Sequence, residues 1–233
     1  MKTLLKKELD FYLNNPIGYI VIVLFSVFVN FFYIKDIFTS SVVSVKPLFN
    51  ILPWFLLIFI SALSMRIFSE EKRLNTIEVL LTLPVSETAI VLAKFFALII
   101  LYVISLVLTL GFVVFLFIFS KLSITEVLVG YLGELLFGAS LLSLSIFISN
   151  KTKNQLIAFF VSIIVLFFLI VLSSEFMGSV LPRIIIDNLI YFSPVYHLQN
   201  FVNGVINLKS LVYFLSFIFV FLFLTIIDLK KRE

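Results

Sequence analysis

The chain has 233 residues, of which 62% are hydrophobic and only 13% are charged. Its mean hydropathy of +1.24 lies far above that of water-soluble domains, so the composition excludes a soluble globule. The absence of cysteine excludes disulfides and thiolate metal sites. The net charge of +4 is scattered between apolar blocks and forms no basic stripe for nucleic acid. The sequence therefore predicts a membrane protein surrounded by lipid.

The first residues predict an amphipathic helix at the membrane surface. Leu4, Leu5, Leu9 and Leu13 recur near helical spacing among charged residues, and Pro16 ends the pattern. The alternative is an ordinary basic flank of the apolar run that follows. That run is too long for a secretory signal and is not followed by a small-residue cleavage site, so we interpret it as a membrane span.

Six apolar runs are long enough to cross a bilayer, which takes about 20 helical residues. They cover residues 17–34, 48–65, 89–120, 127–149, 156–173 and 211–227. Lys94, near the start of the third run, is its only charged residue, and the only charged residue in the fourth run is Glu134. The runs lack the alternation of polar and apolar residues found in outer-membrane barrels. The predicted fold is an all-α integral membrane protein with six transmembrane helices in a single domain over residues 1–233.

The distribution of basic residues predicts the orientation of the chain. Six crossings place both termini on one side, together with most of the 17 Lys and Arg residues. The other side holds Lys35, Lys46, Lys121, Arg183 and Lys209. Because translocation of basic residues is disfavoured, we expect both termini to be cytoplasmic, in a multi-pass protein of the inner (cytoplasmic) membrane.

The external stretch 174–210 is too long for a simple connection. It contains two short apolar segments, broken by Pro182 and by Pro194, and neither is long enough to span. They are predicted to be re-entrant or interfacial helices, and the sequence leaves both possibilities open. The single histidine, His197, has no cysteine or acid pair beside it. A structural role explains it more simply than a metal site.

The cytoplasmic loop 66–88 is dense in charge and predicts a short helix over residues 75–83. Asn75 is a candidate cap, Glu78 would complete a capping box, and Pro84 would stop the helix. Because so short a helix is not stable alone in water, it must pack on its own membrane domain or on a partner. No glycine precedes a lysine, so the chain has no Walker-type loop and is not expected to hydrolyse ATP.

Three separated blocks of this sequence resemble ABC-2-type transporter permeases, in particular the gliding-motility-associated type. The blocks are SEEKRLNTIEVLLTLPVSETAIVLAKF, GELLFGASLLSLSIFISNKTKNQLIAF and YFSPVYHLQNFVNGVINLKSLVYFLSFIFVFLFLTIIDLKKRE. The resemblance implies six spans, an interfacial N-terminal helix, a cytoplasmic coupling helix and short external helices before the last span. It also implies an exporter of two permeases, identical or different, driven by separate ATPase subunits that bind ATP and Mg. No cofactor or metal is expected on this chain.

By this resemblance, the helix at 75–83 is the coupling helix that contacts the ATPase. The candidate contact residues are Glu70, Glu71, Lys72, Arg73, Thr76, Ile77, Glu78, Leu80, Leu81 and Pro84. The competing hypothesis is a membrane scaffold that transports nothing and recruits a cytoplasmic partner through the same 66–88 loop. ATP-dependent movement of a substrate would separate the two.

Glu134, in the fourth predicted span, is a second candidate site. An ionised carboxylate at mid-membrane costs about 2.5–3.5 kcal/mol, so such a residue usually faces protein or water. Gly130, Glu134 and Gly138 lie four residues apart and form one helical stripe, which would let another helix approach closely. Helix packing and contact with a transported substrate both remain possible. Asn30, in the first span, is a weaker candidate of the same kind.

Overall fold

The computed structural model describes residues 2–40, 43–81, 85–120, 122–173 and 189–231, and within these ranges it is helical, with no strand. The elements are α1 (Lys2–Leu13), α2 (Pro16–Ser40), α3 (Lys46–Ser64), α4 (Ser69–Arg73), α5 (Thr76–Leu81), α6 (Glu87–Phe119), α7 (Ile124–Lys151), α8 (Gln155–Val171), the 3-10 turn η1 (Ile190–Phe192), α11 (Pro194–Val202) and α12 (Leu208–Lys230). The prediction of an all-α fold is therefore confirmed for the part of the chain that the structure describes.

Among the described residues, five helical segments are long and apolar enough to cross a membrane. They are Gly18–Thr39, Lys46–Arg73, Glu87–Phe119, Ile124–Lys151 and Leu208–Lys230. Six were predicted. The run at 156–173 forms α8, which has 17 residues and at 1.5 Å per residue covers about 25 Å, short of the roughly 30 Å of hydrocarbon. Within the described residues the structure thus supports five of the six predicted spans.

Polar side chains cap the N-terminal ends of four helices, which are α6, α7, α8 and α12. At the starts of α6 and α7, the hydroxyls of Ser86 and Ser123 accept from backbone amides three residues on. At the starts of α8 and α12, the amide oxygens of Asn154 and Asn207 accept from amides two residues on, at 2.9 and 3.0 Å. Each side chain satisfies one of the N–H groups that a helix start leaves unpaired, which fixes where the helix begins.

The central helix of the bundle is α7, which packs against α3, α6, α8, α11 and α12. Its glycines lie at the closest approaches: a Cβ on Gly130 would come 2.1 Å from the Phe49 ring, and one on Gly133 would come 2.3 Å from Phe201. Aromatic rings of α3 and α11 can therefore lie directly on the α7 backbone. The outer helices α2 and α12 leave most of their apolar surface exposed, as lipid-facing helices do.

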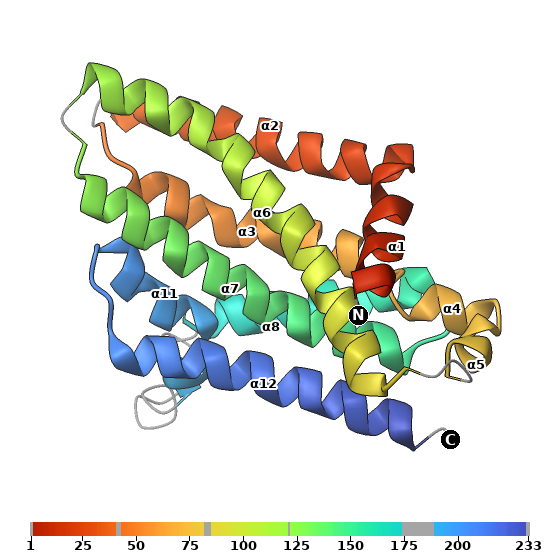
Figure 1. The fold of residues 1–233 in the computed structure, drawn as a ribbon. Coiled ribbons are helices and arrows are strands. Elements are labelled where there is room, and N and C mark those ends of the chain that lie inside the picture. The colour runs from red at the N-terminus through yellow and green to blue at the C-terminus, as the bar shows by residue number, and fades with distance from the viewer. Residues whose placement is uncertain (1, 41–42, 82–84, 121, 174–188, 232–233) are drawn as a thin grey trace.

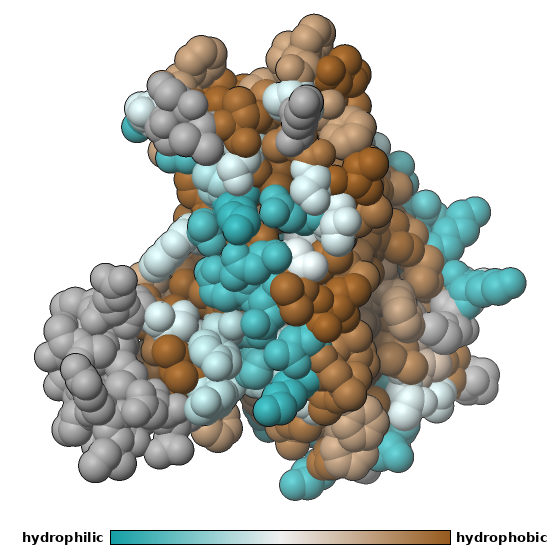
Figure 2. All heavy atoms as spheres, turned by 90° about the vertical axis from the view of Figure 1, so that its left-hand side faces the viewer, coloured by the Kyte–Doolittle hydropathy of each residue, from teal (hydrophilic) through white to brown (hydrophobic). Residues whose placement is uncertain are grey.

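The two ends of the bundle differ (Figure 1). One end carries α1, lying across the end of α2, together with α4, α5 and both chain termini. We call it the α4–α5 end. Figure 2 views the opposite end and shows a hydrophilic band among apolar surface. There the Lys46 ammonium donates to Asn203 at 3.2 Å, and the Gln199 amide donates to Asn50 at 3.3 Å.

The predicted re-entrant or interfacial stretch 174–210 is described only from residue 189. Its helix α11 packs against α3, α7, α8 and α12, and Leu198 and Phe201 are buried. His197 is also buried, stacked on Tyr213 with ring centroids 4.0 Å apart and hydrogen-bonded to Tyr191 and Ser210. Burial lowers the pKa of His197 below that of a free imidazole. The side chain is a packed structural residue.

Candidate coupling site

The charged side chains of the short helix α4 are held by several neighbouring elements at the α4–α5 end. It follows α3 after one turn, and its charged run is held first by local pairs. Glu70 accepts from Arg66 at 2.8 Å and lies 3.6 Å from Arg73. The spacings are i,i+4 and i,i+3, which place these side chains on one face of the helix. The next two residues, Glu71 and Lys72, point to different neighbours and carry the longer-range contacts.

Lys94 links its own helix, α6, to α1 and to α4. Its ammonium donates to Glu8 of α1 and to Glu71 of α4, both at 2.8 Å, and to the backbone oxygen of Ile67 at 2.9 Å. The ring of Phe68 lies 5.1 Å below it. With only 3% of its side chain exposed, Lys94 uses all three donors of the ammonium group inside the protein. We call Lys94, Glu8 and Glu71 the lysine cluster.

A second polar chain holds the other side of α4. The ammonium of Lys72, which is buried, donates to Asn150 at 2.6 Å, and the Asn150 amide donates to Asp228 at 2.9 Å. Lys151 forms an ion pair with Asp228 as well. Since Asn150 and Asp228 lie at the ends of α7 and α12, this chain ties α4 to both helices. The hydroxyl of Ser149 adds to it by accepting from two backbone amides before and in α4.

A sharp turn separates α4 from α5. Asn75 has φ +55°, in the left-handed region that asparagine enters more readily than most residues. A residue that caps the start of a helix usually has extended backbone, so this conformation does not match the predicted cap. In α5, Ile77 is buried at 8% exposure, while Thr76 and Glu78 are exposed. The backbone of Leu80 is in α5, but the Leu80 and Leu81 side chains and Pro84 lie outside the described residues.

The structure therefore divides the predicted contact residues into two groups. Glu70, Glu71 and Lys72 make contacts inside the protein, as does Ile77, whereas Glu78 faces outward. The residues that hold α4 were not predicted from the sequence; they are Glu8, Lys94, Asn150 and Asp228. One signal was available: Lys94 is the only charge in its long apolar run, and a lone charge beside a membrane span needs a partner. Nothing local in the sequence indicated which acids those would be.

The second predicted group, on α7, has the geometry of a packing site. A Cβ on Gly138 would lie 2.3 Å from the Tyr102 ring, and the Tyr102 hydroxyl donates to the backbone oxygen of Glu134 at 2.6 Å. Glu134 is fully buried, and its carboxyl oxygens have no hydrogen-bond partner among the described residues. Asn30, on α2, donates to the backbone of its own helix at 2.9 Å. The described residues hold no group of His, Cys, Asp and Glu that could bind a metal.

We expect the substitution Glu134→Gln to leave assembly and transport unchanged. The amide has nearly the shape of a neutral carboxyl, so the packing of α7 on Tyr102 is preserved. Yield and monodispersity after purification, followed by a transport assay, measure this, with Glu126→Gln at the start of α7 as the control. Lost transport in a normally assembled protein would instead assign Glu134 to the substrate path.

Residues 2–227 match the family described as ABC-2 family transporter protein. The chain belongs to this ABC-2 transporter family. As an ABC-2 protein it is a permease component of an ABC transporter and a multi-pass membrane protein. Permeases of this family normally carry no catalytic activity; they generally pair with a separate ABC ATPase and with another permease. Comparison with curated proteins gives no match.

Proposed function

We propose that this ABC-2 protein is the permease subunit of an exporter, that it forms the substrate path with a second permease, and that a separate ATPase drives it through α5. The observation that carries the proposal is the double attachment of α4. One side is tied to α1 and α6 through Lys94, and the other to α7 and α12 through Lys72 and Asn150. A short helix held so firmly can transmit movement into the bundle.

The mechanism follows from these contacts. A push on α5 would pass through the turn at Asn75 to α4, and from there to the ends of α6, α7 and α12. Because packed interfaces switch between discrete arrangements and do not deform smoothly, a small displacement at α4 would shift whole helices. In this proposal Ile77 anchors α5 on the protein and Glu78 faces the ATPase. ATP and Mg would be bound by the partner, not by this chain.

The proposed topology has six spans, with α8 as the fifth and both termini in the cytoplasm of a cell with the protein in its inner membrane. The balance of basic residues supports it. The α1 helix would lie in the cytoplasmic interface, since only Tyr12 among its residues is buried. The assignment to the gliding-motility-associated type remains a prediction from the resemblance in sequence.

The substitution Leu80→Asp tests the docking role of α5. We expect it to abolish co-purification of the ATPase without loss of membrane insertion, because a carboxylate is costly to bury in an apolar interface. Lys209→Ala, at the opposite end of the bundle, is the control and should retain the ATPase. Retention of the ATPase by Leu80→Asp would reject α5 as the docking element. Substrate-stimulated ATP hydrolysis in the reconstituted complex would distinguish an exporter from the scaffold alternative.

A further inference from the structure

We propose that a row of three adjoining hollows along α1, α2 and α3 binds a phospholipid whose headgroup carries both a primary amine and a phosphate, as phosphatidylethanolamine does. The inference goes beyond the proposed function and does not depend on an ATPase partner. It stands on three hollows that share lining residues and run from the α4–α5 end along the outside of the bundle.

The first hollow is a cavity of about 290 Å³ between α1, α4 and α6, lined by both apolar and charged side chains. Its charged lining residues are Lys7, Glu8, Arg66, Glu70, Glu71 and Lys94. Two polar groups of this lining lack a partner in the part of the chain that the structure describes. Lys7 forms no ion pair among the described residues, and the second carboxylate oxygen of Glu71 is buried without a hydrogen-bond partner. The lining thus contains one cation without an ion pair and one carboxylate, paired with Lys94, whose second oxygen lacks a hydrogen bond.

The cavity continues into apolar surface. It shares Phe11, Tyr12 and Arg66 with a narrow neck of about 10 Å³, which lies between the α1–α2 junction and the end of α3. The neck in turn shares Val21 and Ala62 with a groove of about 440 Å³. Charged groups at one end and an apolar channel along the membrane span match an amphipathic ligand whose long axis follows α2.

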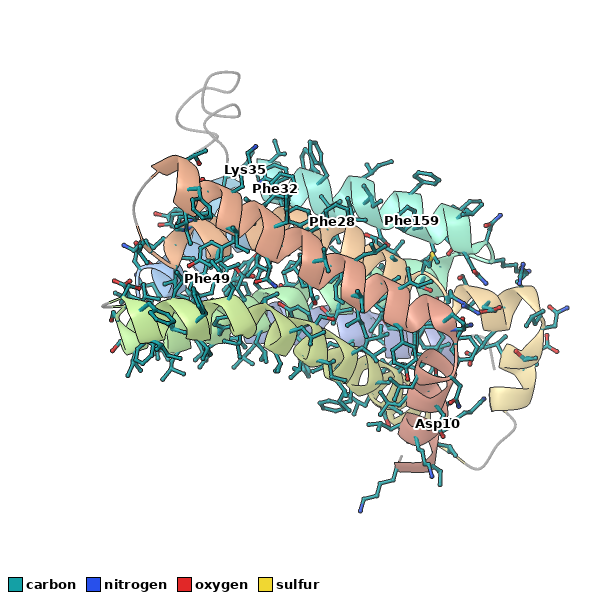
Figure 3. All side chains as sticks on the ribbon, turned by 90° about the horizontal axis from the view of Figure 1, so that it is seen from above. Asp10, Phe28, Phe32, Lys35, Phe49 and Phe159 are labelled. Carbon is teal, nitrogen blue, oxygen red and sulfur yellow. The ribbon has the colours of Figure 1, made fainter. Side chains whose placement is uncertain are left out.

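The groove itself is lined only by apolar side chains of α2 and α3. They are Val21, Leu24, Phe25, Phe28, Phe32, Phe55, Ile58, Phe59 and Ala62. Phe28 and Phe32 lie on the side of α2 that is turned toward α8 and away from α6 (Figure 3), so the groove opens outward. Ile58 on its floor is 56% exposed. An acyl chain fits this setting, because the groove lies where lipid tails surround a spanning helix.

The unsatisfied acceptor selects among lipid headgroups. A primary ammonium can donate a hydrogen bond to the free oxygen of Glu71, whereas the trimethylammonium of phosphatidylcholine has no N–H to donate. The phosphate would meet Lys7, and basic groups near a membrane surface attract lipid phosphates. Phosphatidylglycerol could satisfy Lys7, and its hydroxyls could donate to Glu71, but it would bring no positive charge to the acidic side chains of the cavity. The charges therefore favour phosphatidylethanolamine over both.

Binding can be measured on the full chain in nanodiscs of phosphatidylcholine that contain equal small amounts of phosphatidylethanolamine and phosphatidylglycerol. After transfer to detergent, native mass spectrometry counts the lipids that stay bound. We expect phosphatidylethanolamine to be retained several-fold over the other two. Ala62→Phe, which fills the neck, and Lys7→Gln should each reduce this retention several-fold. The matched controls Ile104→Phe, on the exposed face of α6, and Lys153→Gln, in an exposed loop, should not.

Two results would overturn the proposal. One is that the three lipids are retained equally, or that Ala62→Phe, in a protein with a normal melting temperature, does not reduce the retention of phosphatidylethanolamine. The other is a second copy of the chain in the groove. Since the chain has no cysteine, Phe28→Cys reports on that directly: rapid disulfide crosslinking between two chains in nanodiscs containing phosphatidylethanolamine would show that protein, not lipid, covers the groove.

Discussion

Replacing Lys94 with methionine is expected to destabilise the protein by about 3–5 kcal/mol, the range found when one partner of a buried ion pair is removed. Methionine fills much of the same volume, but Glu8 and Glu71 would then face each other without the cation that both contact at 2.8 Å. The loss should appear as a lower melting temperature in detergent, measured as the fraction of monodisperse protein that survives heating.

The exposed Lys153→Met is the control and should melt like the unsubstituted protein. A second variant separates charge from packing: Lys94→Met combined with Glu8→Gln and Glu71→Gln removes the uncompensated acids and should recover part of the loss. If Lys94→Met alone melted normally, the lysine cluster would not stabilise α4. Within the proposed function, the triple variant should also weaken the coupling of ATP hydrolysis to transport, because α1, α4 and α6 would no longer be linked by charge.

The second large effect is expected from Gly138→Ala in the central helix. The new Cβ would lie 2.3 Å from the Tyr102 ring, far inside van der Waals contact, so the ring must move and its 2.6 Å hydrogen bond to the Glu134 backbone is disturbed. Overpacking of this kind costs about 1–3 kcal/mol. The heating assay described above measures the loss.

Gly111→Ala in α6 is the matched control, because a Cβ there meets no atom within 4 Å. The same chemical change should then be neutral or slightly stabilising, since alanine has the better helix propensity. Equal melting of the two variants would mean that Tyr102 yields without cost and that Gly138 is not a packing residue.

The candidate site was only partly predictable from sequence. The resemblance directed attention to residues 66–88, and the structure has two short helices there, α4 and α5. It did not reveal that Glu71 and Lys72, neighbours in the chain, are tied to opposite sides of the bundle. Contacts between Glu8 and Lys94, or between Lys72 and Asn150, join residues 86 and 78 positions apart. No local pattern encodes such pairs, because they depend on how the helices pack.

The sequence by itself determined the class of protein and the position of its helices. Long apolar runs need lipid, and within them every backbone group must be bonded in a helix, so composition and run length were enough to locate the five spans that the structure supports. The tertiary structure decided how the polar residues at the ends of those runs are used. A buried lysine destabilises the fold when it is unpaired, and it holds helices together when the other helices bring acids within 3 Å of it. Only the packed bundle fixes that geometry.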